Sequence, residues 1–410
     1  MICSLGACLE LFDFSLFLFL IDSIRGVFFP GSSGSSGLLL TLVIFSSGSL
    51  MRPIGGLFFG HIGDKFGRKK AFQLSVTLMA ISSAAIAILP PASSVGAIAP
   101  VLLLLVRMLQ GFSIGGEIPG SCVYASEYFP KNRGYVVGLI FLGITYGNLL
   151  ASAMIGIVRA FMSDHAFNIY GWRICFLVGG LMGILAFNLR KKFAETPVFM
   201  EMKERRLKIP AKQLFVKSWK DVVSGFFAVG TTATSLFVLV RMPDYMEKFC
   251  NVTFQNVQVY TSYMFVILGI GVVFWGYLSD FISRRLIMTI GCVMVIILSF
   301  VSFKVLNGTS SMPLVYIMST LVAFALSIPN GIYACYILEK FPAIYRLSGL
   351  SICYNLGFAI FDGAFPLLIT LFLLSQNSLV AVAYSLSIPA FLSLIFTFFS
   401  SDHSRRTLKF

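Results

Sequence analysis

Long apolar runs alternate with short polar turns along the whole chain. Each run is close to the ~20 residues that an α-helix needs to cross a lipid bilayer. Lipid offers the backbone no hydrogen-bond partners, so helix is the predicted conformation of every run. Twelve transmembrane helices are predicted, at residues 3–24, 37–59, 71–90, 98–124, 134–158, 170–190, 219–241, 258–278, 286–305, 312–338, 347–374 and 379–400. The pattern indicates an all-α membrane protein.

The polar turns of the first half return in the second half. The charged turn at residues 60–69 recurs in weaker form at residues 276–285, with matched positions 216 residues apart. A second pair of turns begins at Glu127 and Glu339, 212 residues apart. Turns that recur at about half the chain length indicate two related halves, and in membrane proteins such halves carry a site at their interface. We therefore predict two pseudo-symmetric six-helix bundles.

These bundles set the predicted domain boundaries. The segment between the halves is charged and short of apolar residues, as expected for a linker. We predict an N-terminal six-helix bundle at 1–190, a cytoplasmic linker at 191–218, a C-terminal six-helix bundle at 219–400 and a short cytoplasmic tail at 401–410. The Gly/Ser-rich stretch at 31–37 is predicted to be a flexible outer loop.

Composition and charge support a membrane protein and exclude a soluble one. Hydrophobic residues make up 57% of the chain and charged residues only 12%, with a mean hydropathy of +0.89. The net charge is +14, yet 23 of the 31 lysines and arginines lie in alternate connections. The positive-inside rule places those connections in the cytoplasm, together with both termini. The basic excess therefore indicates topology and anionic lipid headgroups rather than nucleic acid.

Cysteine and histidine usage gives no sign of a metal or disulfide site. The eight cysteines are scattered, mostly inside apolar runs, and the three histidines are far apart. We predict no disulfide framework, no metal site and no cofactor. Residues 1–24 carry Glu10, Asp13 and Asp22, so no cleavable signal peptide is predicted.

Charged residues inside the predicted helices are candidates for the functional site. Glu10 and Asp13 are three residues apart on one helix face, and Arg107 and Glu117 lie ten apart on another helix. A charge at the bilayer centre costs at least ~2.5–3.5 kcal/mol, so it faces a partner or a wet cavity. Burial favours the protonated acid and a nearby arginine favours the ionised one. We predict that the three acids serve a proton step and that Arg107 tunes them or holds a substrate carboxylate; the alternative is a permanent ion-pair lattice.

Four further polar residues are candidates for the cavity wall. Asp362 lies mid-way along the predicted eleventh helix, where it would meet the cationic end of a zwitterion or a second proton, or simply face the cavity. Tyr146, Asn148 and Asn355 are either cavity contacts or hydrogen-bonding residues between helices.

The charged turns are candidates for a cytoplasmic gate. Asp64 is expected to cap the start of a following helix, and Arg68 to bridge to Glu127. Ion pairs near a surface contribute ~0.2–1 kcal/mol each, which suits links that break together. The alternative is that these charges only fix topology. The predicted gate residues are Asp64, Arg68, Glu127, Arg133, Asp280, Arg284, Glu339 and Arg346.

Several motifs together carry a family resemblance. They lie at residues 10–14, 28–31, 52–60, 107–117, 171–173 and 195–197 in the first half, and at 339–349, Asn355 and Pro366 in the second. With them the chain resembles the major facilitator superfamily, and within it the metabolite:proton symporter family that includes proline/betaine transporters. The second copy of the charged turn departs from the pattern, with Ser283 where a glycine is usual.

The resemblance implies a secondary active transporter rather than an enzyme. It would be a monomer in the bacterial inner membrane that moves a small solute with protons by alternating access. A zwitterion such as proline or betaine is preferred, because Arg107 is taken as the single buried cation. The alternatives are a small carboxylate such as 2-oxoglutarate, citrate or shikimate, and a non-transporting sensor on the same scaffold. Family members that sense osmolality carry a long C-terminal coiled coil, which the short tail does not predict.

Overall fold

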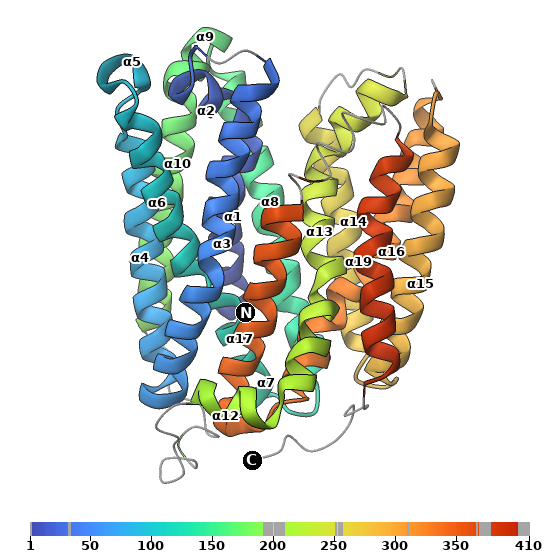
Figure 1. Cartoon of the computed structure of the whole chain (residues 1–410). Coiled ribbons are helices and arrows are strands. Elements are labelled where there is room, and N and C mark those ends of the chain that lie inside the picture. The colour runs from blue at the N-terminus through green and yellow to red at the C-terminus, as the bar shows by residue number, and fades with distance from the viewer. Residues whose placement is uncertain are drawn as a thin grey trace.

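We analysed a computed structural model of the chain, shown in Figure 1. It describes residues 2–31, 34–191, 210–250, 257–309, 311–365 and 379–400, together with the single residues 200, 252 and 368. Most of the predicted linker, the predicted tail and Pro366 lie outside the described residues.

Helices make up the regular structure of the described residues. The first half contains α1 (Ile2–Phe19), α2 (Ile21–Phe28), α3 (Gly34–Phe66), α4 (Arg68–Ile88), α5 (Ala92–Val95), α6 (Ile98–Ile114), α7 (Glu117–Tyr128), α8 (Arg133–Ala160), α9 (Asp164–Ala166), η1 (Phe167–Gly171) and α10 (Trp172–Lys191). The second half contains α12 (Pro210–Lys217), α13 (Trp219–Phe249), α14 (Val257–Leu278), α15 (Arg284–Leu306), α16 (Met312–Leu338), η2 (Ala343–Tyr345), α17 (Arg346–Phe358), η3 (Ala359–Ala364) and α19 (Val380–Phe398).

The helix count agrees with the prediction. Eleven helices in the described part of the chain are long and apolar enough to cross a membrane. Cys3–Phe19 and Ile21–Phe28 form a further pair bent by 59°, which raises the number to twelve if that pair is one span. The sequence predicted this first span at 3–24, whereas the structure breaks it at Leu20 and continues it to Phe28.

Helix ends differ from the prediction where polar residues continue a helix. The tenth span begins and ends as predicted, at 312–338. The second was predicted at 37–59 but runs from Gly34 to Phe66, because the charged turn is itself helical up to Phe66. Its start also corrects the predicted loop at 31–37, since residues 34–37 are helical. The fourth, predicted as one helix at 98–124, is one span at Ile98–Tyr128, with a local turn at Gly115 and Gly116 between α6 and α7.

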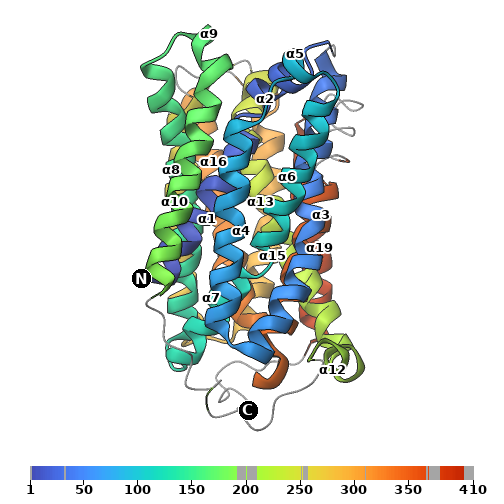
Figure 2. The same cartoon turned by 90° about the vertical axis from the view of Figure 1, so that its left-hand side faces the viewer.

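The long helices stand roughly side by side in two groups (Figures 1 and 2). Within the first half, α1 packs on α8 and α3 packs on α6; within the second, α15 packs on α16 and α19. Between the halves, α14 lies along α8 and α17 lies along α3. We call the end with α7 and α12 the lower end and the end with α2, α5 and α9 the upper end, as drawn in Figure 1.

Glycines set the close approach of α3 to α6. A Cβ at Gly111 would lie 2.7 Å from Cα of Gly48, and a Cβ at Gly115 would lie 2.5 Å from the backbone nitrogen of Gly56. A side chain at either position would force the two helices apart. The crossing therefore holds the middle of α3, including Arg52, at a fixed place in the first half.

Candidate functional site

A narrow cavity of about 50 Å³ lies between the two halves. Small-molecule sites run from ~300 to ~1,000 Å³, so a solute would need this cavity to widen. Helices α1, α3 and α8 supply one wall, and α13, α14, α16 and α17 supply the other. The described lining residues are Leu11, Phe14, Arg52, Phe141, Ile144, Thr145, Asn148, Thr232, Ser235, Leu236, Phe265, Leu268, Val272, Asn330, Tyr333, Tyr354 and Phe358.

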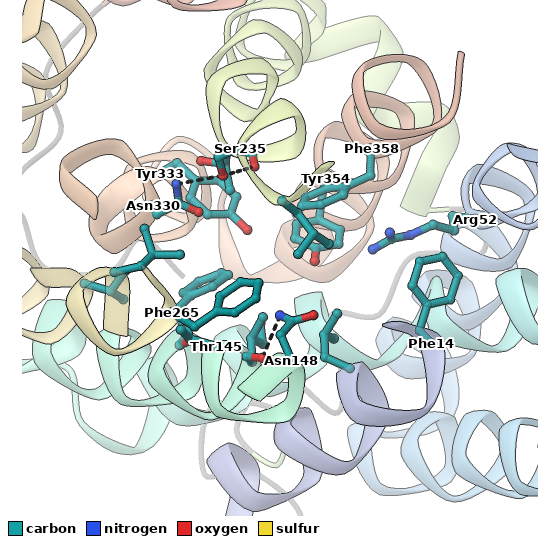
Figure 3. Close-up of a pocket in the computed structure, with 17 residues that line it drawn as sticks. Phe14, Arg52, Thr145, Asn148, Ser235, Phe265, Asn330, Tyr333, Tyr354 and Phe358 are labelled. Carbon is teal, nitrogen blue, oxygen red and sulfur yellow. Dashed lines mark hydrogen bonds between the residues drawn. The ribbon is translucent and has the colours of Figure 1, made fainter. Parts of the chain in front are cut away.

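One charge and several polar groups face this largely aromatic cavity (Figure 3). Arg52 is the charged residue among the described lining residues. On the α8 wall, Asn148 Nδ2 donates to the Ile144 carbonyl at 3.1 Å and its Oδ1 accepts from Ser15. On the opposite wall, Asn330 Nδ2 donates to Ser235 Oγ at 3.2 Å. The remaining wall is mainly aliphatic and aromatic.

Aromatic rings hold the Arg52 guanidinium at the cavity edge. Its Cζ lies 4.5 Å from the ring centroid of Phe358, 5.3 Å from that of Tyr354 and 5.7 Å from that of Phe14. Arg52 Nε makes no hydrogen bond in the described part of the chain. Stacking on ring faces orients the planar group while leaving N–H donors for a ligand.

A second charged group lies behind the cavity, inside the first half. Asp13 on α1 accepts hydrogen bonds from Ser83 and from Gln110 Nε2. Gln110 Oε1 in turn accepts from Arg107. Asp13 and Arg107 are thus joined through one amide, and both are buried. Asp13 Oδ1 makes no hydrogen bond among the described residues, so this carboxylate has a position open to a proton.

Phe14 connects this acid–arginine group to the cavity. The Phe14 ring lies 4.6 Å from Arg107 Cζ on one side and 5.7 Å from Arg52 Cζ on the other. It lines the cavity and directly follows Asp13 in α1. A movement of α1 would therefore act on both guanidinium groups at once.

The other predicted acids are buried away from the described cavity lining. Glu10 and Asp362 are buried, and Glu117 is buried at the start of α7. Glu117 and Arg107 lie in the same span, Ile98–Tyr128, with a local turn at Gly115 and Gly116 between them.

Of the uncharged polar candidates, one lines the cavity and two do not. Asn148 lines the cavity, as expected. Tyr146 does not, because it lies about 160° around α8 from Asn148 and is 41% exposed. Asn355 is buried and joins the halves instead, since its Nδ2 donates to the Gly115 carbonyl at 2.6 Å.

The eight predicted gate residues come together in two clusters at the lower end. In the first cluster, Asp64 pairs with Arg68 at 2.8 Å, and Arg68 lies 3.7 Å from Glu127. Arg346 of the second half contacts Glu127 at 3.2 Å. Asp64 Oδ2 accepts from the backbone N–H of Ser348 at 3.0 Å and from its hydroxyl at 2.6 Å.

The second cluster repeats the first with the halves exchanged. Asp280 pairs with Arg284 at 2.7 Å, and Arg284 pairs with Glu339 at 2.7 Å. Arg133 of the first half contacts Glu339 at 2.6 Å. Asp280 accepts from the backbone N–H groups of Gly134 and Tyr135 at 2.8 and 2.9 Å. Each aspartate therefore meets the start of a helix in the opposite half, where the helix dipole favours negative charge.

Two expectations about these turns need correction. Asp64 was expected to cap the helix that follows it, but it caps α17 across the interface. The ion pairs were expected to be weak surface links, but seven of the eight residues are buried and Asp280 is half-buried, because the opposite half covers them. Ser283, which stands where a glycine is usual, accepts from Leu286 N–H through its side chain and caps α15.

The comparisons with known proteins agree with this architecture. The sequence model of the major facilitator superfamily matches residues 3–352. The chain belongs to the major facilitator superfamily. This major facilitator chain is 30% identical over 423 residues to the proline/betaine transporter of Salmonella typhimurium, covering 99% of the chain and 83% of the relative. It is 32% identical over 397 residues to the ectoine/proline transporter of Corynebacterium glutamicum, covering 91% and 77%.

A solved structure has the same fold. The proton:xylose symporter XylE bound to 6-bromo-6-deoxy-D-glucose matches with a TM-score of 0.78 over 99% of this chain and 96% of that one, at 17% identity. At that identity the match shows the fold alone. The family match and the relatives show that this protein is a multi-pass membrane protein and a secondary transporter, not an enzyme.

Sequence reasoning missed Arg52 as a site residue of this major facilitator chain. It lies in the motif at 52–60 but was treated as part of the lead into the charged turn. The statement that Arg107 is the single buried cation is therefore wrong, because Arg52 is only 2% exposed. The position of Arg52 was the available signal. It lies fourteen residues before the end of α3, deep inside a span, where a charge is costly and faces a partner or a cavity.

The double variant Asp64→Asn, Asp280→Asn is expected to open the lower end of this major facilitator protein. Losing a hydrogen bond to a charged group costs ~1–3 kcal/mol. The population of the state with a closed lower end should therefore fall about 5-fold or more relative to the open state. Cys335 reports this, because it is buried under the gate and its Sγ donates to the Arg133 carbonyl at 3.2 Å. Labelling of Cys335 by a permeant maleimide should accelerate by that factor, with all other cysteines replaced.

Cys292 is the matched control for this labelling. It is buried inside the second half and does not lie at the interface between the halves. As the single cysteine, it should react at the same slow rate in both backgrounds. Equal acceleration at Cys292 would mean general loosening, and unchanged labelling of Cys335 would show that the two aspartates do not hold the gate closed.

Proposed function

We propose that this protein takes up a small zwitterionic solute of the proline or betaine type, in symport with protons, by alternating access. The carrying observation is the cavity between the halves, which combines a single lining guanidinium with walls rich in aromatic rings. An arginine fork binds a carboxylate with two parallel hydrogen bonds. Aromatic faces attract a quaternary or secondary ammonium group. A solute that carries both groups fits both surfaces.

The proposed pose follows from where these groups lie. The carboxylate would bind Arg52 on α3, beside Phe14, Tyr354 and Phe358. The cationic end would then point across the cavity toward Tyr333 and Phe265 (Figure 3). The names of the relatives, proline/betaine and ectoine/proline transporters, support this substrate class.

The proposed proton site is Asp13, with Arg107 as its partner through Gln110. An ionised Asp13 would attract the guanidinium of Arg107. Protonation of Asp13 would remove that attraction. Phe14 lies between Arg107 and Arg52, so the protonation state of Asp13 would be sensed at the solute site. A proton moving down a 100 mV potential supplies ~2.3 kcal/mol, enough for roughly fifty-fold accumulation.

The proposed cycle opens and closes the two ends in turn. In this structure both gate clusters join the halves at the lower end. Separation of these clusters would open the cavity downward. We assign the lower end to the cytoplasm from the positive-inside rule, in the inner membrane of a bacterium, with the protein acting as a monomer.

A small carboxylate is the second candidate substrate. Arg52 favours it, since the argument against a carboxylate depended on Arg107 being the only buried cation. One lining guanidinium suits one carboxylate group better than the two or three of 2-oxoglutarate or citrate. A monoanion is thus the stronger form of this alternative.

Uptake into proteoliposomes tests the proposal. The panel contains labelled proline, glycine betaine, 2-oxoglutarate and citrate, each with and without an imposed proton gradient. We expect gradient-driven accumulation of proline or betaine and no accumulation of the two carboxylates. Accumulation of the carboxylates alone would overturn the zwitterion assignment, and uptake that ignores the proton gradient would overturn the coupling.

A further inference from the structure

Asp362 has no task in the proposed cycle, yet it is among the most deeply buried acids of the chain. It lies in η3, a π-helical turn at Ala359–Ala364 that continues α17. Such turns widen a helix by one residue and are frequent at functional sites. The turn rests on α3 of the other half, where Ser46 Oγ donates to the Gly363 carbonyl at 2.8 Å.

The carboxylate of Asp362 points at Arg52. Its Oδ2 lies 4.0 Å from Arg52 Nη1 and accepts from Ser49 Oγ at 3.4 Å. Its Oδ1 makes no hydrogen bond among the described residues. A buried carboxylate held so loosely is balanced mainly by charge, and the nearest positive group is the guanidinium of Arg52. The pair joins the two halves across their interface.

Arg52 lies between Asp362 and the cavity. Arg52 lines the cavity, whereas Asp362 is not among its described lining residues. Asp362 therefore does not touch a solute; it acts on the solute through Arg52. Seen from the cavity, Arg52 and Asp362 together form a neutral pair, and the Asp13 and Arg107 pair behind Phe14 is neutral as well.

This balance favours a solute without net charge. A zwitterion adds one carboxylate at Arg52 and one cation at the aromatic wall, so it leaves the net charge around the Arg52–Asp362 pair unchanged. A carboxylate without a cation leaves one uncompensated negative charge in a buried site, where like charges cost several kcal/mol. Without the charge of Asp362, the same anion would instead neutralise Arg52.

We propose that Asp362 is the counter-ion of Arg52 that makes the cavity select net-neutral solutes over anions. The proposal deepens the function proposed above and rests on it, because it presumes that a solute carboxylate binds Arg52. Asp362 is a positioning residue in this role, and its effect is on selectivity rather than on the presence of a site.

A pair of near-isosteric solutes tests this role. Proline and cyclopentanecarboxylate have the same ring size and carboxylate, but the second lacks the ring nitrogen and is an anion. Each competes with labelled glycine betaine for uptake. Asp362→Asn is expected to lower the ratio of the half-inhibitory concentrations, anion over zwitterion, by about tenfold or more. Asp362→Glu keeps the negative charge, and its ratio should stay within about threefold of the wild-type ratio.

The controls keep the outcome decisive. Asp164→Asn makes the same chemical change in the short helix α9 at the upper end and should leave the ratio unchanged. If Asp362→Asn loses uptake, the same ratio is read from the thermal stabilisation of the purified variant by each solute. A ratio equal to wild type in Asp362→Asn, by either readout, overturns the proposal.

Failure of the proposed function gives a different result. In that case wild-type protein neither transports nor binds proline or glycine betaine, whatever residue 362 is. If wild type handles both zwitterions and the selectivity ratio does not respond to Asp362→Asn, the function stands and the role of Asp362 is wrong.

Discussion

Arg52→Ala is expected to weaken solute binding by at least about 30-fold, because loss of one partner of a buried charged hydrogen-bonded pair costs ~2–5 kcal/mol. Arg52 is the charged group among the described lining residues, whereas Arg107 lies behind Phe14 and is not among them. Arg52→Lys keeps the charge but loses the planar fork and the stacking on Phe358, and should bind with intermediate affinity. Binding of labelled glycine betaine to purified protein measures both variants.

Arg241→Ala is the matched control for this experiment. Arg241 lies near the upper end of α13 and pairs with Asp244 at 2.9 Å, away from the described lining of the central cavity. It should bind glycine betaine like wild type. If Arg52→Ala also bound like wild type, the solute would have to lie elsewhere and the central cavity would lose its assignment.

Asp13→Asn is expected to abolish gradient-driven accumulation while leaving exchange intact. The amide cannot take up a proton, yet it can still accept from Ser83 and Gln110 as Asp13 does. The cavity keeps its lining, so labelled solute should still exchange with unlabelled solute across the membrane. Counterflow and proton-driven uptake, measured in the same proteoliposomes, separate the two activities.

Asp22→Asn controls for the loss of an acid on the same span. Asp22 lies on α2, and its side chain is 71% exposed, so its variant should accumulate solute normally. Normal accumulation by Asp13→Asn would remove Asp13 from the proton step. Glu10→Gln and Glu117→Gln would then test the other two predicted acids, and unchanged uptake in all three would contradict every coupling residue named here.

The fold and the charged residues that cluster at the lower end could be predicted from the sequence because both depend on local patterns. Apolar runs of span length specify helices wherever lipid surrounds them. The repeated turns placed Asp64 with Arg68 and Asp280 with Arg284 four residues apart, and in each pair the arginine begins the helix that follows the turn. Their partners in the opposite half, such as Ser348 and Gly134, depend on how the halves pack, which no local pattern specifies.

The cavity wall was harder to predict for the same reason. A membrane helix is apolar on nearly all sides, so its sequence gives little indication of which side faces a cavity. Asn148 and Tyr146 are two residues apart and equally plausible by composition, yet only Asn148 lines the cavity. The π-helical turn at Asp362 changes side-chain directions in a way that helical periodicity does not predict.

Solute-induced proton entry tests the central claim most directly. Wild-type protein is placed in proteoliposomes that contain a trapped pH-sensitive dye, and glycine betaine or proline is added outside without an imposed gradient. The account predicts that the lumen acidifies as labelled solute enters, with both rates falling together in Asp13→Asn. Solute entry without acidification would contradict it, as would a lumen that acidifies equally when no solute is added.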